Sequence, residues 1–112
     1  MLGALRKKDI GIHFPNTKKD IKGIRSTVML KKVLNMLIKN NFSVNNIDIN
    51  LICEKPKVNF YRNKIINSLS YLLSLDKSKI NLKGKTVEKL GIIGKEKAIA
   101  CEVISSIIRW VN

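Results

Sequence analysis

The sequence predicts a single α+β domain, an α/β sandwich in which helices pack on a sheet. Two segments place apolar residues at helical spacing, others place them at alternate positions, and the two kinds follow each other along the chain. At 112 residues the chain is long enough for one hydrophobic core. A hydrophobic content of 45% and a charged content of 27% are ordinary for a globular protein.

The first helix is expected to begin at Ser26, a residue type that caps helices, after a loop-rich stretch of 25 residues with several Gly, Pro and Asn. Asn40 and Asn41 should end it. One face of this helix is apolar because of Leu30, Val33, Leu34, Leu37 and Ile38.

A half-buried strand follows, in which apolar residues alternate with Asp48, Asn50 and Glu54. Pro56 should end this strand, since proline cannot donate a ladder hydrogen bond. The apolar positions are Ile47, Ile49, Leu51 and Cys53. A second helix is expected from about Arg62 to Leu75, and residues 80–85 form another expected strand.

The last segment, residues 98–108, fits two patterns. Residues 99, 101, 103 and 107 suit a strand with Glu102 pointing outward, whereas residues 100, 103, 104, 107 and 108 suit one helical face. Periodicity by itself favours the helix.

A formal charge of +14 raises the possibility of a nucleic-acid-binding protein. The cations are 18 lysines and only 4 arginines, no lysine run exceeds two, and Lys, Ile and Asn together make up 47 residues. These three residue types share A/T-rich codons, so compositional drift accounts for most of the charge. Clustered arginines and aromatics, which nucleic-acid binding favours, are lacking.

Cys53 and Cys101 lie among apolar neighbours without metal-ligand spacing, so both are expected to be buried thiols. No signal peptide and no membrane span are expected either. The sequence therefore predicts a soluble, intracellular protein.

Four collinear segments resemble one family, the 2-C-methyl-D-erythritol 2,4-cyclodiphosphate synthases. Residues 9–17 (DIGIHFPNT) are similar to its Asp-Ile-Gly-x-x-Phe-Pro-Asp-Thr-Asp signature, and residues 22–26 (KGIRS) to its Lys-Gly-Ala-Asp-Ser segment. Residues 52–57 (ICEKPK) resemble its strand-end nucleotide loop. Residues 85–94 (KTVEKLGIIG) and 99–102 (IACE) resemble its Thr-Thr-Thr-Glu-Lys-Leu-Gly-Phe-x-Gly-Arg run and the Ile-Ala-Cys-Glu beyond it.

The resemblance implies a mixed sheet with helices on one face, in a chorismate-mutase-like topology, with the last segment as a strand; we adopt this over the helical periodicity. It implies a phosphorus–oxygen lyase of the non-mevalonate isoprenoid pathway. In this reaction the 2-phosphate of a CDP-linked methylerythritol attacks the diphosphate phosphorus nearer the methylerythritol. The attack expels CMP and closes the cyclic diphosphate. It also implies a homotrimer in the bacterial cytoplasm, or alternatively in a plastid, with no nucleic-acid or membrane partner.

By the same resemblance, three groups of residues are expected to bind the substrate. The ribose would be met by Asp9, Ile10 and Gly11, and the methylerythritol end by Phe14, Pro15, Asn16, Thr17 and Lys18. The cytosine pocket would be formed, mainly through backbone, by Cys53, Glu54, Lys55, Pro56, Lys57, Val58 and Asn59. Asn16 and Lys18 stand where the family has acidic residues. If the resemblance is set aside, Asp9 would be a solvated residue in a turn and Phe14 a residue of the hydrophobic core.

The third group would bind the diphosphate and consists of Lys85, Thr86, Val87 and Glu88. Thr86 would stabilise the charged transition state, and Glu88 would ligate Mg²⁺ or Mn²⁺ together with substrate phosphates. Ile92 and Lys95 replace a family phenylalanine and arginine near the trimer channel, and Glu102 would face polar groups at the trimer axis. If the resemblance is set aside, Glu88 would be an exposed glutamate at the end of a strand, and Lys57 would be a surface lysine.

The family's zinc ligands and its His-Ser dipeptide have no match here, and the lone histidine, His13, aligns with a variable position. Zn²⁺ is therefore expected in the full-length enzyme only. Residues 1–4 resemble the end of the family's first long helix, so residues 1–112 are expected to be one cyclodiphosphate synthase domain that is incomplete at its N-terminus. We expect this chain alone to lack cyclase activity. Two alternatives are a non-catalytic nucleotide-binding or oligomerising remnant and a small basic nucleic-acid-binding protein.

Overall fold

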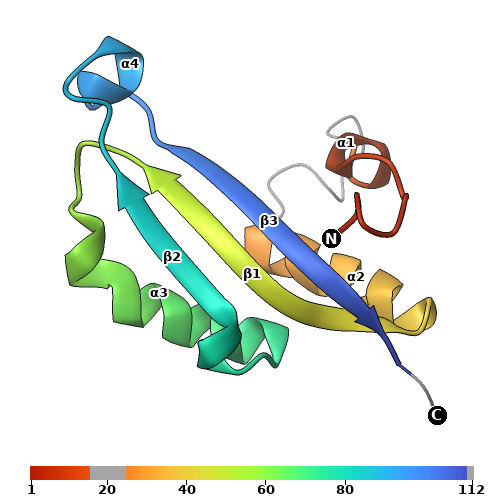
Figure 1. Cartoon of the computed structure of the whole chain (residues 1–112). Coiled ribbons are helices and arrows are strands. Elements are labelled where there is room, and N and C mark those ends of the chain that lie inside the picture. Colours follow the sequence, from red (N-terminus) through yellow and green to blue (C-terminus); the bar gives the residue numbers. More distant parts are fainter. Residues whose placement is uncertain (16–24, 111–112) are drawn as a thin grey trace. The chain divides into compact units, whose positions relative to one another are not determined.

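The structure, a computed structural model, describes residues 1–15 and 25–110 (Figure 1). The described residues fall into two compact units, one of residues 1–15, 25–45 and 106–110, the other of residues 46–105. In chain order the elements are α1 (Ile10–His13), α2 (Ser26–Lys39), β1 (Phe42–Ile52), α3 (Val58–Leu73), the 3₁₀ turn η1 (Lys77–Lys79), β2 (Ile80–Lys85), α4 (Gly91–Gly94) and β3 (Ala100–Arg109).

The three strands form a mixed sheet in the order β2-β1-β3. Strands β1 and β2 are parallel, with Ile47 opposite Ile80 and Ile52 opposite Lys85. Strand β3 runs in the opposite direction beside β1 (Figure 1). The predicted mixed sheet is therefore confirmed, and two parallel strand ends finish side by side.

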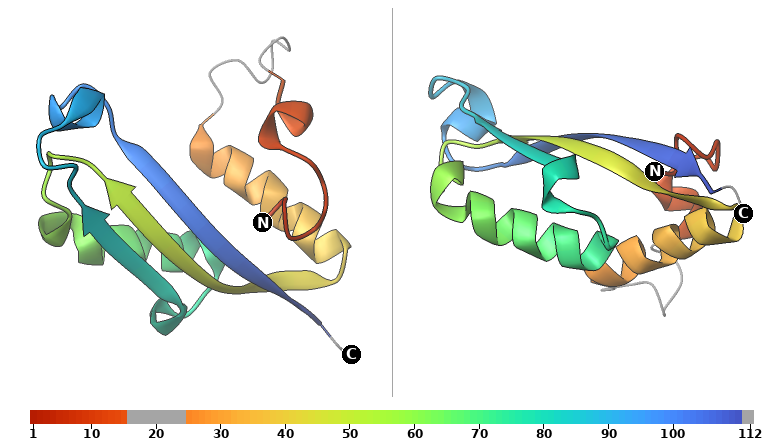
Figure 2. Two further views of the ribbon diagram at one scale, coloured as in Figure 1. Left: turned by 45° about the horizontal axis from the view of Figure 1, so that its top comes forward. Right: turned by 60° about the horizontal axis from the view of Figure 1, so that its bottom comes forward.

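Helix α3 connects β1 to β2 and lies along one face of the sheet in the unit of residues 46–105 (Figure 2). Its contact with β2 follows from the alternation of the strands, since every second side chain points toward the helix. The outward side of α3 carries Phe60 and Tyr71, which are 82% and 85% exposed. The buried core of this unit consists of Ile47, Ile49, Cys53, Leu73, Leu75, Ile80 and Leu82.

The other unit has its own apolar centre. Phe14 and Val33 pack together with Met1, Leu2 and Met29, and Leu37 of α2 is only 1% exposed. Lys32 adds a cation–π contact, with Nζ 5.9 Å from the Phe14 ring centroid. The inward face predicted for α2 is thus the one that holds its buried residues.

The last segment is strand β3, so the helix favoured by local periodicity is not formed. Its pairing with β1 decides the conformation, because a ladder supplies the backbone hydrogen bonds that a helix would otherwise make. The prediction that Cys101 is buried is wrong: the thiol is exposed, while Cys53 is buried as predicted. The reason is that β3 is an edge strand whose neighbouring apolar residues, such as Ile104, are also exposed.

Several predicted boundaries differ from the structure. Arg25, not Ser26, occupies the N-cap position of α2, and no side chain caps that end. The first strand begins at Phe42, five residues before the predicted alternation, and α3 begins at Val58 rather than Arg62. Helix α3 ends at Leu73, two residues before the predicted end, because Ser74 adopts the left-handed conformation. The strand predicted at residues 80–85 is confirmed at both ends.

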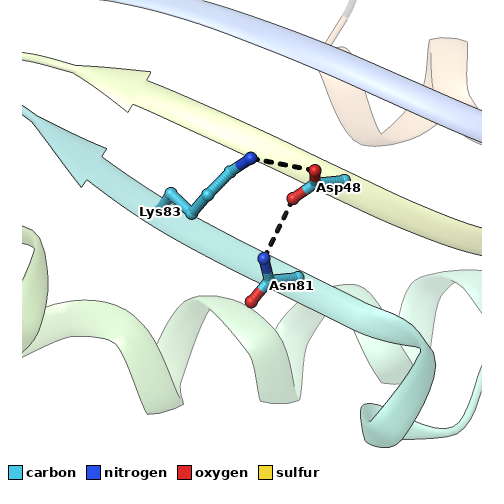
Figure 3. Close-up of polar contacts among 3 residues, drawn as sticks. All are labelled: Asp48, Asn81 and Lys83. Atoms are coloured by element: carbon cyan, nitrogen blue, oxygen red, sulfur yellow. Dashed lines mark hydrogen bonds and ion pairs between the residues drawn. The ribbon is translucent and has the colours of Figure 1, made fainter.

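Asp48, Asn81 and Lys83 form a polar cluster (Figure 3). They alternate along β1 and β2 with the buried Ile47, Ile49, Ile80 and Leu82, and so lie on the opposite face of the sheet. Lys83 Nζ and Asn81 Nδ2, both on β2, donate to the two carboxylate oxygens of Asp48 on β1, at 2.9 and 3.0 Å. The hydrogen bond from Lys83 and then that from Asn81 hold the pKa of Asp48 below its usual value of 3.8. The cluster therefore favours the ionised carboxylate in the folded protein.

This lowered pKa gives a pH dependence of stability. A carboxyl group whose pKa is depressed by folding stabilises the folded state above its unfolded pKa and loses that contribution as pH falls through the folded pKa. We expect the free energy of unfolding of wild type to exceed that of Asp48→Asn above pH 3.8, and the gap to shrink below it. Urea unfolding at a series of pH values measures this gap. In Lys83→Met, NMR titration should find the Asp48 pKa closer to 3.8; an unchanged Asp48 pKa would contradict the assignment.

Candidate nucleotide site at the parallel strand ends

A pocket of about 320 Å³ opens where β1 and β2 end and α3 begins, within the unit of residues 46–105. The carboxyl ends of parallel strands are where open α/β sheets commonly bind ligands, and the volume lies at the lower end for small-molecule sites. The pocket is lined by Cys53, Glu54, Pro56, Lys57, Val58, Asn59, Arg62, Gly84, Lys85 and Thr86. The structure therefore brings the predicted cytosine segment, apart from Lys55, and Thr86 to one cavity.

Backbone pairing joins the two strand ends. The Cys53 N–H donates to the Lys85 carbonyl oxygen at 3.0 Å, which extends the β1–β2 ladder by one bond beyond the strand. The buried Cys53 thiol donates to the Pro56 carbonyl oxygen at 3.4 Å and so closes the turn that leads into α3.

The wall of the pocket is rich in cations. Lys57, Arg62 and Lys85 line it together with one carboxylate, Glu54. The Arg62 guanidinium is fixed by two bonds, from Nε to the Leu82 carbonyl oxygen at 3.2 Å and from Nη1 to Asn59 Oδ1 at 2.8 Å. This excess of positive charge suits an anionic ligand such as a diphosphate.

Arg62 and Gly84 line the pocket although neither is among the residues predicted for the site. Arg62 follows Asn59 by three residues in α3, and residues at this spacing lie on the same helical face, which was the available signal. Gly84 allows a close approach: a Cβ there would lie 2.8 Å from the Val58 Cβ. A side chain at this position would press into the floor of the pocket.

The loop of residues 86–90, here called the Thr86 loop, leads from β2 to α4. Thr86 is exposed, and both Glu88 and Lys89 have positive φ, at 55° and 62°. The N–H groups of Val87 and Lys89 donate to the same carboxylate oxygen of Glu54, at 3.0 and 3.1 Å. A side chain from the end of β1 therefore holds the loop that follows β2.

The remaining predicted residues of this unit lie outside the pocket wall. Glu88 is exposed on the Thr86 loop, and Ile92 and Lys95 are exposed in and after α4. Lys55 points to solvent and forms an ion pair with Glu96 at 3.6 Å. An exposed pair of this kind contributes little to stability.

The predicted ribose and methylerythritol residues belong to the other unit where they are described. Asp9 caps α1 by accepting a bond from the Ile12 N–H at 3.1 Å, so its carboxylate has a structural partner. Phe14 is buried, as the alternative of a core residue requires. Ile10 and Gly11 are exposed in α1, and Pro15 is half-buried. Asn16, Thr17 and Lys18 lie outside the described residues, as does the 22–24 part of the predicted Lys-Gly segment.

Within residues 1–15 and 25–110, no three His, Cys, Asp or Glu side chains gather as a metal centre. His13 Nε2 forms a 2.6 Å hydrogen bond with the Lys7 carbonyl oxygen. The side chains of residues 1–15 and 25–110 therefore do not fit a zinc ion. Glu88 does fit Mg²⁺ shared with a phosphorylated ligand, because a free carboxylate supplies the hard oxygen that magnesium prefers and phosphates supply the rest.

Comparison with known proteins gives one consistent family. The family model described as the YgbB family matches residues 1–108. The bifunctional enzyme IspD/IspF of Pelagibacter ubique is 47% identical over 109 residues, covering 97% of this chain and 29% of that protein. The 2-C-methyl-D-erythritol 2,4-cyclodiphosphate synthase of Halothermothrix orenii is 44% identical over 102 residues, covering 91% of this chain and 62% of that enzyme.

A solved structure of IspF from Plasmodium falciparum in complex with CDP superposes with a TM-score of 0.82 at 39% identity, over 99% of this chain and 65% of that one. The agreement supports the predicted α+β fold. The chain spans less than two thirds of the length of these relatives. None of the helices in its described part is long and apolar enough to cross a membrane.

Proposed function

The chain belongs to the YgbB family, and from this premise we propose that it provides the nucleotide-binding part of a 2-C-methyl-D-erythritol 2,4-cyclodiphosphate synthase. The proposed substrate is 4-CDP-2-C-methyl-D-erythritol 2-phosphate, and the products are the cyclic diphosphate and CMP. The observation that carries the proposal is the strand-end pocket, which residues 53, 54 and 56–59 line together with Thr86.

The reaction transfers a phosphoryl group within one molecule. An oxygen of the 2-phosphate attacks the phosphorus nearer the methylerythritol, and the bond from that phosphorus to the bridging oxygen of CMP breaks. The electron pair of the broken bond leaves with CMP. Catalysis then consists mainly of aligning the two phosphates and of stabilising the negative charge that spreads over their oxygens.

Each residue of the pocket has a role in this scheme. The backbone of residues 53–59 would bind cytosine, and Lys57, Arg62 and Lys85 would balance the diphosphate charge. The Thr86 hydroxyl would donate to a diphosphate oxygen as charge develops. Glu88 would hold Mg²⁺ against the same phosphates; bound there, the ion would neutralise part of their charge.

The sugar end and the assembly remain expectations from the family. Asp9, Ile10 and Gly11 would meet the ribose, and residues 14–18 the methylerythritol. Exposed apolar side chains on β3, such as Val103 at 54% and Ile104 at 78%, support the proposed homotrimer, because apolar surface of this kind commonly marks an interface. Curated relatives include bacterial and apicoplast proteins, so the cytoplasmic location stays a prediction with a plastid as its alternative.

CDP with Mg²⁺ is expected to raise the Tm of the purified chain, because a ligand that binds only the folded protein stabilises it. At one hundred times its Kd the gain is about 2.7 kcal/mol. Thr86→Ala should weaken CDP–Mg²⁺ binding roughly tenfold or more, since a hydrogen bond to a charged group is worth roughly 1.5–3 kcal/mol. Differential scanning fluorimetry and calorimetric titration measure the two effects.

Thr27→Ala is the matched control, since Thr27 is exposed on α2 in the other unit. It should leave the affinity unchanged. A Tm that ignores CDP in the presence of Mg²⁺ would remove the support for a nucleotide site. If binding to duplex DNA is found instead and falls steeply with salt, the charge of +14 acts on nucleic acid. An in-frame Asp-x-His and His-Ser in the coding sequence upstream of Met1 would distinguish an enzyme from a non-catalytic remnant.

A further inference from the structure

We propose that Glu54 is a positioning residue: its carboxylate holds the Thr86 loop in the one conformation that presents Thr86 and Glu88 to the substrate phosphates. The inference rests on the proposed function for the meaning of those two residues. The attachment of the loop to Glu54 rests only on two hydrogen bonds in the structure, so it does not depend on the proposed function.

Two hydrogen bonds from the Thr86 loop converge on the Glu54 carboxylate. One oxygen of Glu54 accepts hydrogen bonds from two backbone N–H groups of the loop, Val87 at 3.0 Å and Lys89 at 3.1 Å. These two donors belong to the residues on either side of Glu88, so the loop is tied before and after this residue to the segment that follows β1. Hydrogen bonds to an ionised acceptor are about twice as strong as neutral ones.

The loop needs such an anchor because its own conformation is unfavourable. Glu88 and Lys89 carry side chains yet adopt positive φ, a region that L-residues other than glycine avoid. Backbone N–H groups in alternating turn conformations form a concave anion site. Here the chain's own carboxylate fills that site, so these two amides are not free to bind a phosphate. In the proposed function, the phosphates would instead be bound by the Thr86 hydroxyl, the pocket cations and a metal ion that Glu88 would hold.

The anchor also ties the loop to the nucleotide segment. Glu54 follows Cys53, whose N–H is bonded to the Lys85 carbonyl oxygen immediately before Thr86. The segment expected to bind cytosine and the loop expected to bind diphosphate are thus fixed to each other at three neighbouring hydrogen bonds. Glu54 would therefore set the distance between the two ends of the nucleotide site.

Amide hydrogen exchange of the full chain tests the anchor without reference to function. Glu54→Ala should speed exchange at Val87 and Lys89 roughly ten- to hundredfold, the loss expected for a bond to a charged acceptor. Glu54→Gln keeps an accepting oxygen at the same reach and should change exchange less than tenfold. Glu54→Asp is shorter by one methylene and should resemble Glu54→Ala, which keeps the test valid if the alanine variant fails to fold. Unaltered exchange at both amides in Glu54→Asp would overturn the proposal.

Calorimetric titration with CDP and Mg²⁺ then tests the consequence. Affinity should fall about tenfold in Glu54→Ala or Glu54→Asp and recover in Glu54→Gln. Glu96→Ala, which removes an exposed glutamate from the same unit, is the matched control and should bind like wild type. Faster exchange with undiminished affinity would overturn the positioning role. If wild type itself binds no CDP, the proposed function fails, whereas the exchange result still decides whether Glu54 holds the loop.

Discussion

Gly94→Ala is expected to lower CDP–Mg²⁺ affinity by more than tenfold and to destabilise the chain by about 1–3 kcal/mol, the usual cost of forcing a group into a packed site. A Cβ on Gly94 would collide with the backbone of Lys89, including its carbonyl carbon, oxygen and Cα. Backbone atoms cannot rotate aside as a side-chain end can. The Thr86 loop would therefore have to move, and Glu88 would move with it.

Gly91 provides the matched comparison because it belongs to the same short helix, α4. It has a φ of +66°, and a Cβ there would meet nothing within 4 Å. Gly91→Ala should cost about 1–2 kcal/mol from the left-handed conformation, without displacing Lys89. Calorimetric titration and urea unfolding of both variants separate the two effects. Equal CDP affinity in Gly94→Ala and Gly91→Ala would show that the Lys89 contact does not control the site.

Ile47→Ala is expected to lower the free energy of unfolding by about 2–5 kcal/mol. Ile47 is 4% exposed on β1 and lies opposite Ile80 of β2. Its truncation leaves a cavity that the surrounding side chains fill only in part. Because small domains have about 5–15 kcal/mol of stability in total, this loss is a large share of it. Urea unfolding followed by circular dichroism gives the value.

Ile104 is the matched control, being an isoleucine on a strand of the same unit but 78% exposed. Ile104→Ala should change the free energy of unfolding by no more than about 0.5 kcal/mol. A loss in Ile104→Ala as large as that in Ile47→Ala would contradict the burial pattern in the monomer. It would point instead to an interface over β3.

The proposed nucleotide site was predictable in part. The segment from Cys53 to Asn59 and the residues from Lys85 to Glu88 were assigned by resemblance. One cavity is lined by the first segment apart from Lys55, and by Lys85 and Thr86 of the second. Arg62 was assigned only to a helix, since its role depends on the distance from α3 to the Leu82 carbonyl oxygen. The burial of Phe14 was left as an alternative, because an aromatic residue in a loop carries no local sign of which unit will cover it.

The sequence by itself determined the α+β class, the inward faces of α2 and β1, and the family, because periodicity and motif spacing are local properties of the chain. The resemblance also predicted a strand for the last segment, against its helical periodicity, and this strand is confirmed. Only the tertiary structure decided that Cys101 is exposed and that Glu54 binds the loop 33 and 35 residues beyond it. Both depend on burial or hydrogen bonding between segments that are far apart in the chain, which periodicity and motif spacing do not describe.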